Sequence, residues 1–183
     1  MTTTCFVRHS LALAAFFALP LAQAATIDQS SYQTGKTQIG ADYKAEKKAC
    51  SSLSANAKDI CVQEAKAKEK VTRAELDANY SGKEKDLNRL QVVKAESAYA
   101  VAKERCDDQS GNAKDVCVKA AKAAEVKALA DVKVVKQVSE AKTDAAQTKV
   151  DADYKVAAEK CDAMAGEAKS SCMASAKSRF GKT

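Results

Sequence analysis

Apolar and polar residues alternate along most of this chain with the period of an α-helix. From about residue 38 to Phe180, alanine and valine recur three, four and seven residues apart, with lysine and glutamate between them. The clearest stripe consists of Val118, Ala121, Ala128, Val132 and Val135. No segment shows the period-two alternation that is typical of a strand. The pattern predicts an all-α protein without a sheet.

The first 37 residues depart from this pattern. Residues 11–22 form an apolar run that follows Arg8 and ends at Ala22-Gln23-Ala24, a small-x-small sequence that signal peptidase recognises. The run is short for a bilayer span, which needs about 20 residues. We predict a signal peptide at 1–24 with cleavage after Ala24. The mature chain is then expected in the periplasm, with no integral membrane segment. The alternative is that the run stays uncleaved as a membrane anchor. The polar residues 25–37 are expected to be a flexible lead-in.

Three copies of one sequence unit fill the helical region. Each copy contains a tyrosine, a cysteine seven residues later and a second cysteine after ten intervening residues: Tyr43, Cys50 and Cys61; Tyr99, Cys106 and Cys117; Tyr154, Cys161 and Cys172. The copies lie about 55 residues apart, and the words NAKDIC and NAKDVC recur in the first two. We expect a repeat domain at 38–183, with units at about 38–81, 82–140 and 141–183.

The cysteine spacing constrains how each pair can bond. In one unbroken helix, cysteines eleven residues apart lie about 16 Å apart along the axis, whereas a disulfide requires Cα atoms about 4.4–6.8 Å apart. An exported chain with six cysteines after signal removal favours disulfides. We predict three αα-hairpins joined by the disulfides Cys50–Cys61, Cys106–Cys117 and Cys161–Cys172, each with its tyrosine beneath. Cross-links between different units or chains remain the alternative.

Turn residues lie between the two cysteines of each pair. Gly111 and Gly166 are expected to end helices in the left-handed conformation, and the first unit has Ala55 at this position. Capping boxes are predicted for three pairs, Asn56 with Asp59, Asn112 with Asp115, and Ser81 with Glu84. Residues 137–144 are only weakly marked as a turn, which leaves open whether the helix breaks there.

The apolar content is low for an ordinary core. From Ala25 onward, Leu, Ile, Val and Phe make up 23 of 159 residues, and alanine makes up 32. Alanine favours helices but buries little surface. Each disulfide closes a short loop and adds about 3 kcal/mol in the chain-entropy description. We therefore expect the three hairpins to depend on their disulfides, either as an antiparallel bundle or as an elongated helical rod.

The residues that carry chemistry give little support to catalysis. After signal removal the chain has no histidine, which excludes Ser-His and Cys-His pairs, and its carboxylates alternate with lysines as on solvated helices. We expect no enzyme activity and no cofactor. The net charge of +5 after removal is spread along the chain, so no nucleic-acid partner is expected. The alternative is a thiol-based, copper-type site of soft sulfur ligands, Cys161, Met164, Cys172 and Met173.

The repeated Tyr-x6-Cys-x10-Cys unit and the NAKDVC and NAKDIC words resemble a group of exported bacterial proteins rich in alanine and lysine that carry TolA-like or cell envelope biogenesis labels. The resemblance covers about residues 43–177. It implies a location and a fold more than an activity. TolA itself has a membrane-anchoring N-terminal helix and a globular C-terminal domain. We expect this chain, which reads to Thr183, to lack such a C-terminal domain. We expect a structural, scaffolding or stress-protective role in the envelope, with an envelope protein as partner or self-association through alanine-rich faces.

Overall fold

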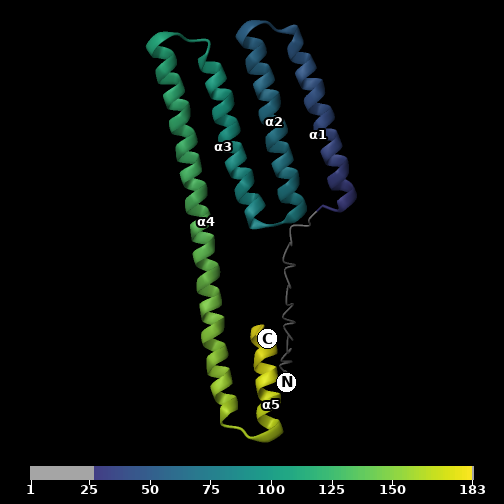
Figure 1. The fold of residues 1–183 in the computed structure, drawn as a ribbon, viewed down its shortest axis with the longest axis vertical. Helices are drawn as coiled ribbons and strands as arrows, with labels where there is room; N and C mark the ends of the chain where they lie inside the picture. Colours follow the sequence, from purple (N-terminus) through teal and green to yellow (C-terminus); the bar gives the residue numbers. More distant parts are fainter. Residues whose placement is uncertain (1–26, 183) are drawn as a thin grey trace, which may run out of the picture.

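A computed structural model describes residues 27–182; the predicted signal peptide at 1–24 lies outside this range. Its elements are α1 Gln29–Ala49, a short 3₁₀ turn η1 Cys50–Ser52, α2 Ala55–Ser81, α3 Glu84–Cys106, α4 Gly111–Asp162 and α5 Gly166–Phe180 (Figure 1). No strand occurs among the described residues. The all-α prediction is confirmed.

Within residues 27–182 the helices form a row in which each helix packs only on the helices next to it in sequence. Figure 1 shows α1, α2, α3 and the first part of α4 side by side in one layer, while α5 returns along the far end of α4. Helix α4 has 52 residues, so it is about 78 Å long. We name the pair α1–α2 hairpin 1, α3 with the first half of α4 hairpin 2, and the last part of α4 with α5 hairpin 3.

The structure combines the two arrangements that the sequence left open. Hairpins 1 and 2 lie side by side as a small antiparallel bundle, and α4 carries hairpin 3 away from them as a rod would (Figure 1). Helix α4 continues without a break through residues 137–144. Consequently no turn separates the second repeat unit from the third.

The buried apolar residues are few and small. Five of the ten are alanines, three are cysteines, and the remaining two are Ile39 and Leu90. A cluster of buried residues joins α2 to α3 through Ala74, Ala78 and Leu90, with Val71 and Val93 packed against it. Small side chains allow close helix approach but remove little apolar surface from water. The packing thus agrees with the low apolar content of the sequence.

The three disulfides lie at the ends of the hairpins, as predicted. They join Cys50 to Cys61, Cys106 to Cys117 and Cys161 to Cys172, each with 5.6 Å between the Cα atoms. The first cysteine of each pair is 0–2% exposed, which places the sulfur bridges among the most buried groups of the protein. Each disulfide therefore closes the turn of one αα-hairpin.

A flexible lead-in was expected at 25–37. This is wrong for residues 29–37, because helix α1 begins at Gln29. The side chain of Asp28 caps this helix by accepting a hydrogen bond from the backbone N–H of Ser31 at 2.8 Å. A Cβ on Gly35 would lie only 2.9 Å from Cδ1 of Leu76 in α2, so this glycine permits close packing. Residues 25 and 26 lie outside the described range.

The predicted capping boxes at the hairpin turns are also wrong. Helices α2 and α4 begin one residue before the asparagines, at Ala55 and Gly111, whose φ angles are +50° and +55°. The left-handed residue therefore opens the second helix of a hairpin, whereas the sequence predicted that it ends the first. Between α2 and α3, Gly82 ends α2 in the left-handed conformation. There the hydroxyl of Ser81 accepts from the backbone N–H of Lys83 at 3.1 Å.

Candidate functional site

The hairpin turns repeat one local structure three times. In each turn the backbone N–H three residues after the first cysteine donates to that cysteine's carbonyl oxygen: Leu53 to Cys50 at 3.1 Å, Gln109 to Cys106 at 3.0 Å and Met164 to Cys161 at 3.0 Å. An extended residue follows, and the next helix then begins at a left-handed residue. The sequence repeat is thus a repeat of backbone geometry.

An ion pair spans the turn in two of the three hairpins. Lys114 lies 2.9 Å from Asp107, and Lys169 lies 2.9 Å from Asp162. The hydrogen bond to Asp107 raises the pKa of Lys114 above its usual range. Hairpin 1 has Ser51 at the acidic position, so this turn lacks the acidic partner.

The turns of hairpins 1 and 2 are joined to each other. The side-chain amide of Asn56 donates to Oδ1 of Asp108 at 2.7 Å and to the backbone oxygen of Glu104 at 3.3 Å. Nearby, Arg105 of α3 lies 2.5 Å from Glu64 of α2. The sequence singled out Asn56 as a helix cap, and its true role as a link between hairpins depends on a residue 52 positions away.

The three repeated tyrosines are half-buried on the first helix of each hairpin. Tyr154 meets Phe180 of α5 edge-on, with 6.2 Å between ring centroids, and Lys122 of α4 lies 4.9 Å from the ring of Tyr99. Tyr43 lines a crevice between α1 and α2. Each tyrosine therefore faces the second helix of its own hairpin, two turns from the disulfide, as its seven-residue spacing predicts.

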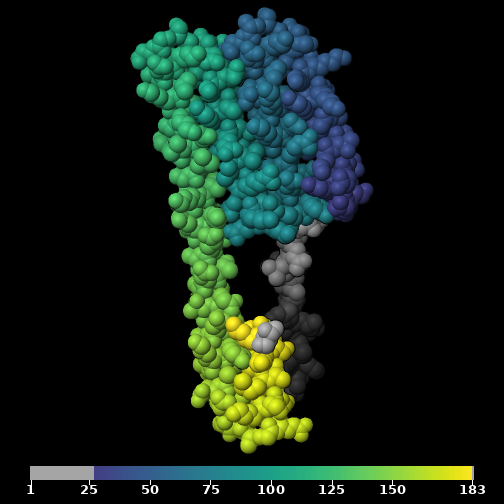
Figure 2. All heavy atoms as spheres, in the orientation of Figure 1, coloured from purple at the N-terminus to yellow at the C-terminus, as the bar shows by residue number. Residues whose placement is uncertain are grey.

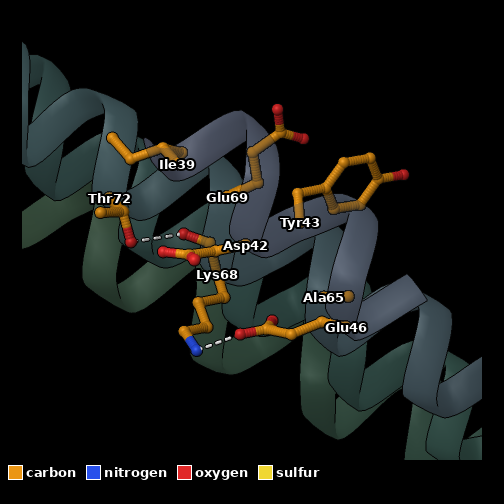
Figure 3. A pocket seen from close by; sticks show the side chains of 8 residues that line it. All are labelled: Ile39, Asp42, Tyr43, Glu46, Ala65, Lys68, Glu69 and Thr72. Atoms are coloured by element: carbon orange, nitrogen blue, oxygen red, sulfur yellow. Dashed lines mark hydrogen bonds and ion pairs between the residues drawn. The ribbon is translucent and has the colours of Figure 1, made fainter. Parts of the chain in front are cut away.

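A small crevice at Tyr43 lies between α1 and α2, where Ile39, Glu46 and Lys68 also line it (Figure 3). Its volume is about 70 Å³, enough for a few water molecules but far below the roughly 300–1,000 Å³ of ligand pockets. Lys68 reaches across it to Glu46, and this hydrogen bond raises the pKa of Lys68. The ammonium therefore stays protonated and serves as a cross-link between the two helices.

A buried carboxylate lies between α3 and α4. Glu125 is 8% exposed, and one of its oxygens accepts from the ammonium of Lys122 at 2.5 Å. Hydrogen bonding to Glu125 raises the pKa of Lys122, whose ammonium also lies over the ring of Tyr99. The Lys122 ammonium thus pairs with the Glu125 carboxylate within the helix interface.

The four residues of the alternative copper-type site lie around the third turn. Cys161 and Cys172 are bonded to each other, Met164 is 46% exposed in the turn, and Met173 is half-buried on α5. A disulfide offers no thiolate to a metal ion. Among the described residues, no three His, Cys, Asp or Glu side chains gather closely enough to hold a metal.

None of the helices in residues 27–182 combines the length and the apolar character needed to cross a membrane. The chain matches no protein-family model, no curated protein and no solved structure. Its own repeated geometry is therefore the basis for a functional assignment.

Proposed function

We propose that this protein is a non-enzymatic periplasmic protein with a structural, scaffolding or stress-protective role in the cell envelope. The observation that carries the proposal is the threefold use of a disulfide-closed helical hairpin. Disulfides of this kind persist in oxidising compartments, and the predicted signal peptide at 1–24 would deliver the chain to one. The resemblance to exported proteins with TolA-like labels supports the same location.

The architecture supports a role in presenting surface. Because the row is one helix thick (Figures 1 and 2), most of its helices have two faces open to solvent. Many of the exposed residues on these faces are lysine, aspartate or glutamate. The charged groups whose pKa values are shifted make hydrogen bonds that join helices, cap them or pair neighbours on one helix. Such an arrangement suits contact with another macromolecule better than chemistry on a small one.

The alternative is a thiol-based metal-binding or sequestering protein. One observation favours it, since hairpin 3 places the exposed thioether of Met164 three residues from Cys161 in the same turn. Copper(I) prefers soft thiolate and thioether ligands. Binding there would require prior reduction of the Cys161–Cys172 disulfide.

Genetic deletion with complementation tests the proposed role. The bacterium that encodes the chain should lose envelope integrity on deletion, measured as leakage of periplasmic enzymes and as detergent sensitivity, and the wild-type gene should restore it. A variant with all six cysteines of residues 25–183 changed to serine should restore it poorly. An intact envelope combined with altered copper tolerance would instead support metal binding.

A further inference from the structure

Helix α4 has one face that no other described helix covers, although most of its residues are apolar. In the described chain α4 contacts only α3, near its start, and α5, near its end. Figures 1 and 2 show both neighbours on the same side of α4. The opposite side carries a stripe at three- and four-residue spacing whose first half consists of Val116, Ala120, Ala123, Lys127, Ala130, Val134 and Val138. Val116, Val134 and Val138 are 57%, 56% and 47% exposed.

The covered side of α4 shows that apolar character normally follows contact in this helix. Where α3 or α5 packs, that side has Ala121, Ala128, Val132, Tyr154 and Ala157, all half-buried. Between the two neighbours it turns polar, with Lys136, Ser139, Glu140, Thr143 and Gln147. The bare stripe does not turn polar in this way. Its apolar residues are therefore unexplained by any contact within residues 27–182.

The sequence repeat identifies what belongs on this face. The second unit follows the first by 56 residues and the third follows the second by 55. By the first offset, the α2 residues Ala67, Ala74 and Ala78 correspond to Ala123, Ala130 and Val134 of the bare stripe. In hairpin 1 these α2 positions pack against α3, the first helix of the next unit. The bare stripe thus corresponds to a surface that receives the next repeat unit.

The next unit of the same chain lies elsewhere, because the turn that would fold it back is missing. The turn Ser81-Gly82-Lys83 corresponds to Gln137-Val138-Ser139. Gly82 has a φ of +60°, which is unfavourable for a β-branched valine. The helix therefore runs straight through Val138 and carries the third unit away.

The ion pairs between α2 and α3 have counterparts on the bare side of α4. Glu75–Lys94, at 2.9 Å, corresponds to Asp131 and Lys149. The pair Asp77–Arg89, at 3.8 Å, corresponds to Lys133 and Asp144. Here the acidic and basic residues have exchanged places, so the two charges are still opposite. The third pair, Glu64–Arg105, becomes Ala120 with Lys160 and introduces no repulsion.

We propose that a second copy of this chain covers the bare face of α4, with the two α4 helices antiparallel and each hairpin 3 packed on the first half of the other copy's α4. Hairpin 3 would then hold the position that α3 holds on α2, in the manner of a domain swap. Residue 133 meets residue 144 of the second copy, and 131 meets 149. In each pair the midpoint of the two residue numbers lies near 139, so the two α4 helices cross there. Each contact from the first copy to the second is therefore matched by the same contact from the second copy to the first, as a two-fold dimer requires.

The second half of α4 supplies a matching surface. Leu90 and Val93 of α3, which face α2, correspond to Ala145 and Thr148, and Ser97 corresponds to Ala152. All three α4 residues are exposed on the side away from α5. In the proposed dimer, Thr148 of one copy lies opposite Lys127 of the other, the charged residue in the first half of the stripe. The two faces that meet are therefore small and mainly apolar, flanked by charges of opposite sign.

Light scattering coupled to size-exclusion chromatography of the oxidised, exported chain tests this dimer over a micromolar to millimolar concentration range. We expect a mass of two chains for the wild type. The double variant Val134→Glu with Val138→Glu should raise the dissociation constant by about 100-fold or more, because two carboxylates would lose water without a partner. The matched control, Thr143→Glu with Ala146→Glu, adds the same charge on the opposite side and should stay dimeric.

A charge exchange separates a lost interface from a damaged fold. Lys133→Asp alone should weaken the dimer, and adding Asp144→Lys should restore it, with unchanged helical circular dichroism throughout. A wild-type chain that is monomeric over the whole range would overturn the proposal. So would a Val134→Glu, Val138→Glu protein that dimerises as well as the control. The test uses purified protein and does not depend on the proposed envelope role.

Discussion

Asn56, in the first turn of α2, donates its side-chain amide to Asp108 in the turn between α3 and α4, with 2.7 Å between Nδ2 and Oδ1. This bond joins the turns of two different hairpins, whereas each disulfide joins two helices of one hairpin. The same amide reaches the backbone oxygen of Glu104 at 3.3 Å. Hairpins 1 and 2 are thereby linked at the end where both disulfides lie.

Replacing Asn56 with alanine should lower the free energy of unfolding by about 1 kcal/mol, because two hydrogen bonds between hairpins are lost. Asn112 is the matched control, since it holds the same repeat position and makes no side-chain hydrogen bond within the described range. Asn112→Ala should have an effect near zero on the monomer. Urea unfolding of both variants measures the difference, and equal losses would show that the link contributes nothing.

At the left-handed position of the hairpin turns, two reciprocal substitutions should change the free energy of unfolding in opposite directions. Ala55 has a φ of +50°, and Gly111 has the same conformation at +55°, where an added methyl group would meet no atom within 4 Å. Ala55→Gly should stabilise the protein by about 0.5–1 kcal/mol, and Gly111→Ala should destabilise it by a similar amount, because L-residues disfavour this conformation. Thermal and urea unfolding of the oxidised proteins provide the test. A destabilising Ala55→Gly change contradicts the assigned turn geometry.

The third disulfide should matter most for local stability. Helix α5 has 15 residues and, of the described helices, contacts α4 alone. An isolated helix of that length is marginal in water. Removing the Cys161–Cys172 bridge by double serine substitution should cost about 3 kcal/mol. Amide hydrogen exchange should then show α5 unprotected while α2 and α3 keep their protection.

The equivalent change in hairpin 1 provides the control for that measurement. Serine at Cys50 and Cys61 should raise exchange in α1 and leave α5 unchanged, because α1 and α5 do not touch. Equal exchange along the entire chain in both variants would argue that the hairpins unfold together.

The pKa of Tyr32 predicts a pH effect at the α1–α2 contact. Its hydroxyl donates to Asp77 at 2.8 Å, and this bond, followed by burial, raises the pKa of Tyr32 above its ordinary value. A group whose pKa rises on folding stabilises the fold below its unfolded pKa of about 10. That contribution is lost as the pH rises through the folded pKa.

Tyrosinate absorbance can follow this titration, with Tyr32→Phe identifying the signal of Tyr32. Asp77→Ala should return the pKa of Tyr32 toward its ordinary value. Asp86→Ala, at a half-buried carboxylate of α3 that makes no hydrogen bond to Tyr32, should not. An unchanged titration in Asp77→Ala would contradict the assigned hydrogen bond.

The sequence was sufficient to predict the hairpins because their constraint is local. Cysteines eleven residues apart must be brought together by a chain reversal, and Gly111 and Gly166 lie where it occurs. The turn conformation was predicted correctly, but its place was not, since the left-handed residue begins the second helix. Without a side-chain cap at Ser54 or Ser110, no residue marked the start of that helix.

Features that depend on distant contacts escaped the sequence pattern. Residues 29–37 are too polar to suggest a packed helix, yet Tyr32 stacks on Tyr80 with 4.4 Å between ring centroids. The link from Asn56 to Asp108 was missed because it joins two repeat units. The continuity of α4 was undecided because no strong breaker or cap occurs at 137–144.

The central claim is that each cysteine pair is a permanent bridge within one hairpin. Mass spectrometry of protein isolated from the bacterium that encodes it, alkylated under denaturing conditions before any reduction, tests it most directly. We predict no alkylated cysteine and three linked peptide pairs, Cys50 with Cys61, Cys106 with Cys117 and Cys161 with Cys172. Six alkylated thiols, with copper bound to the native protein, would contradict the account.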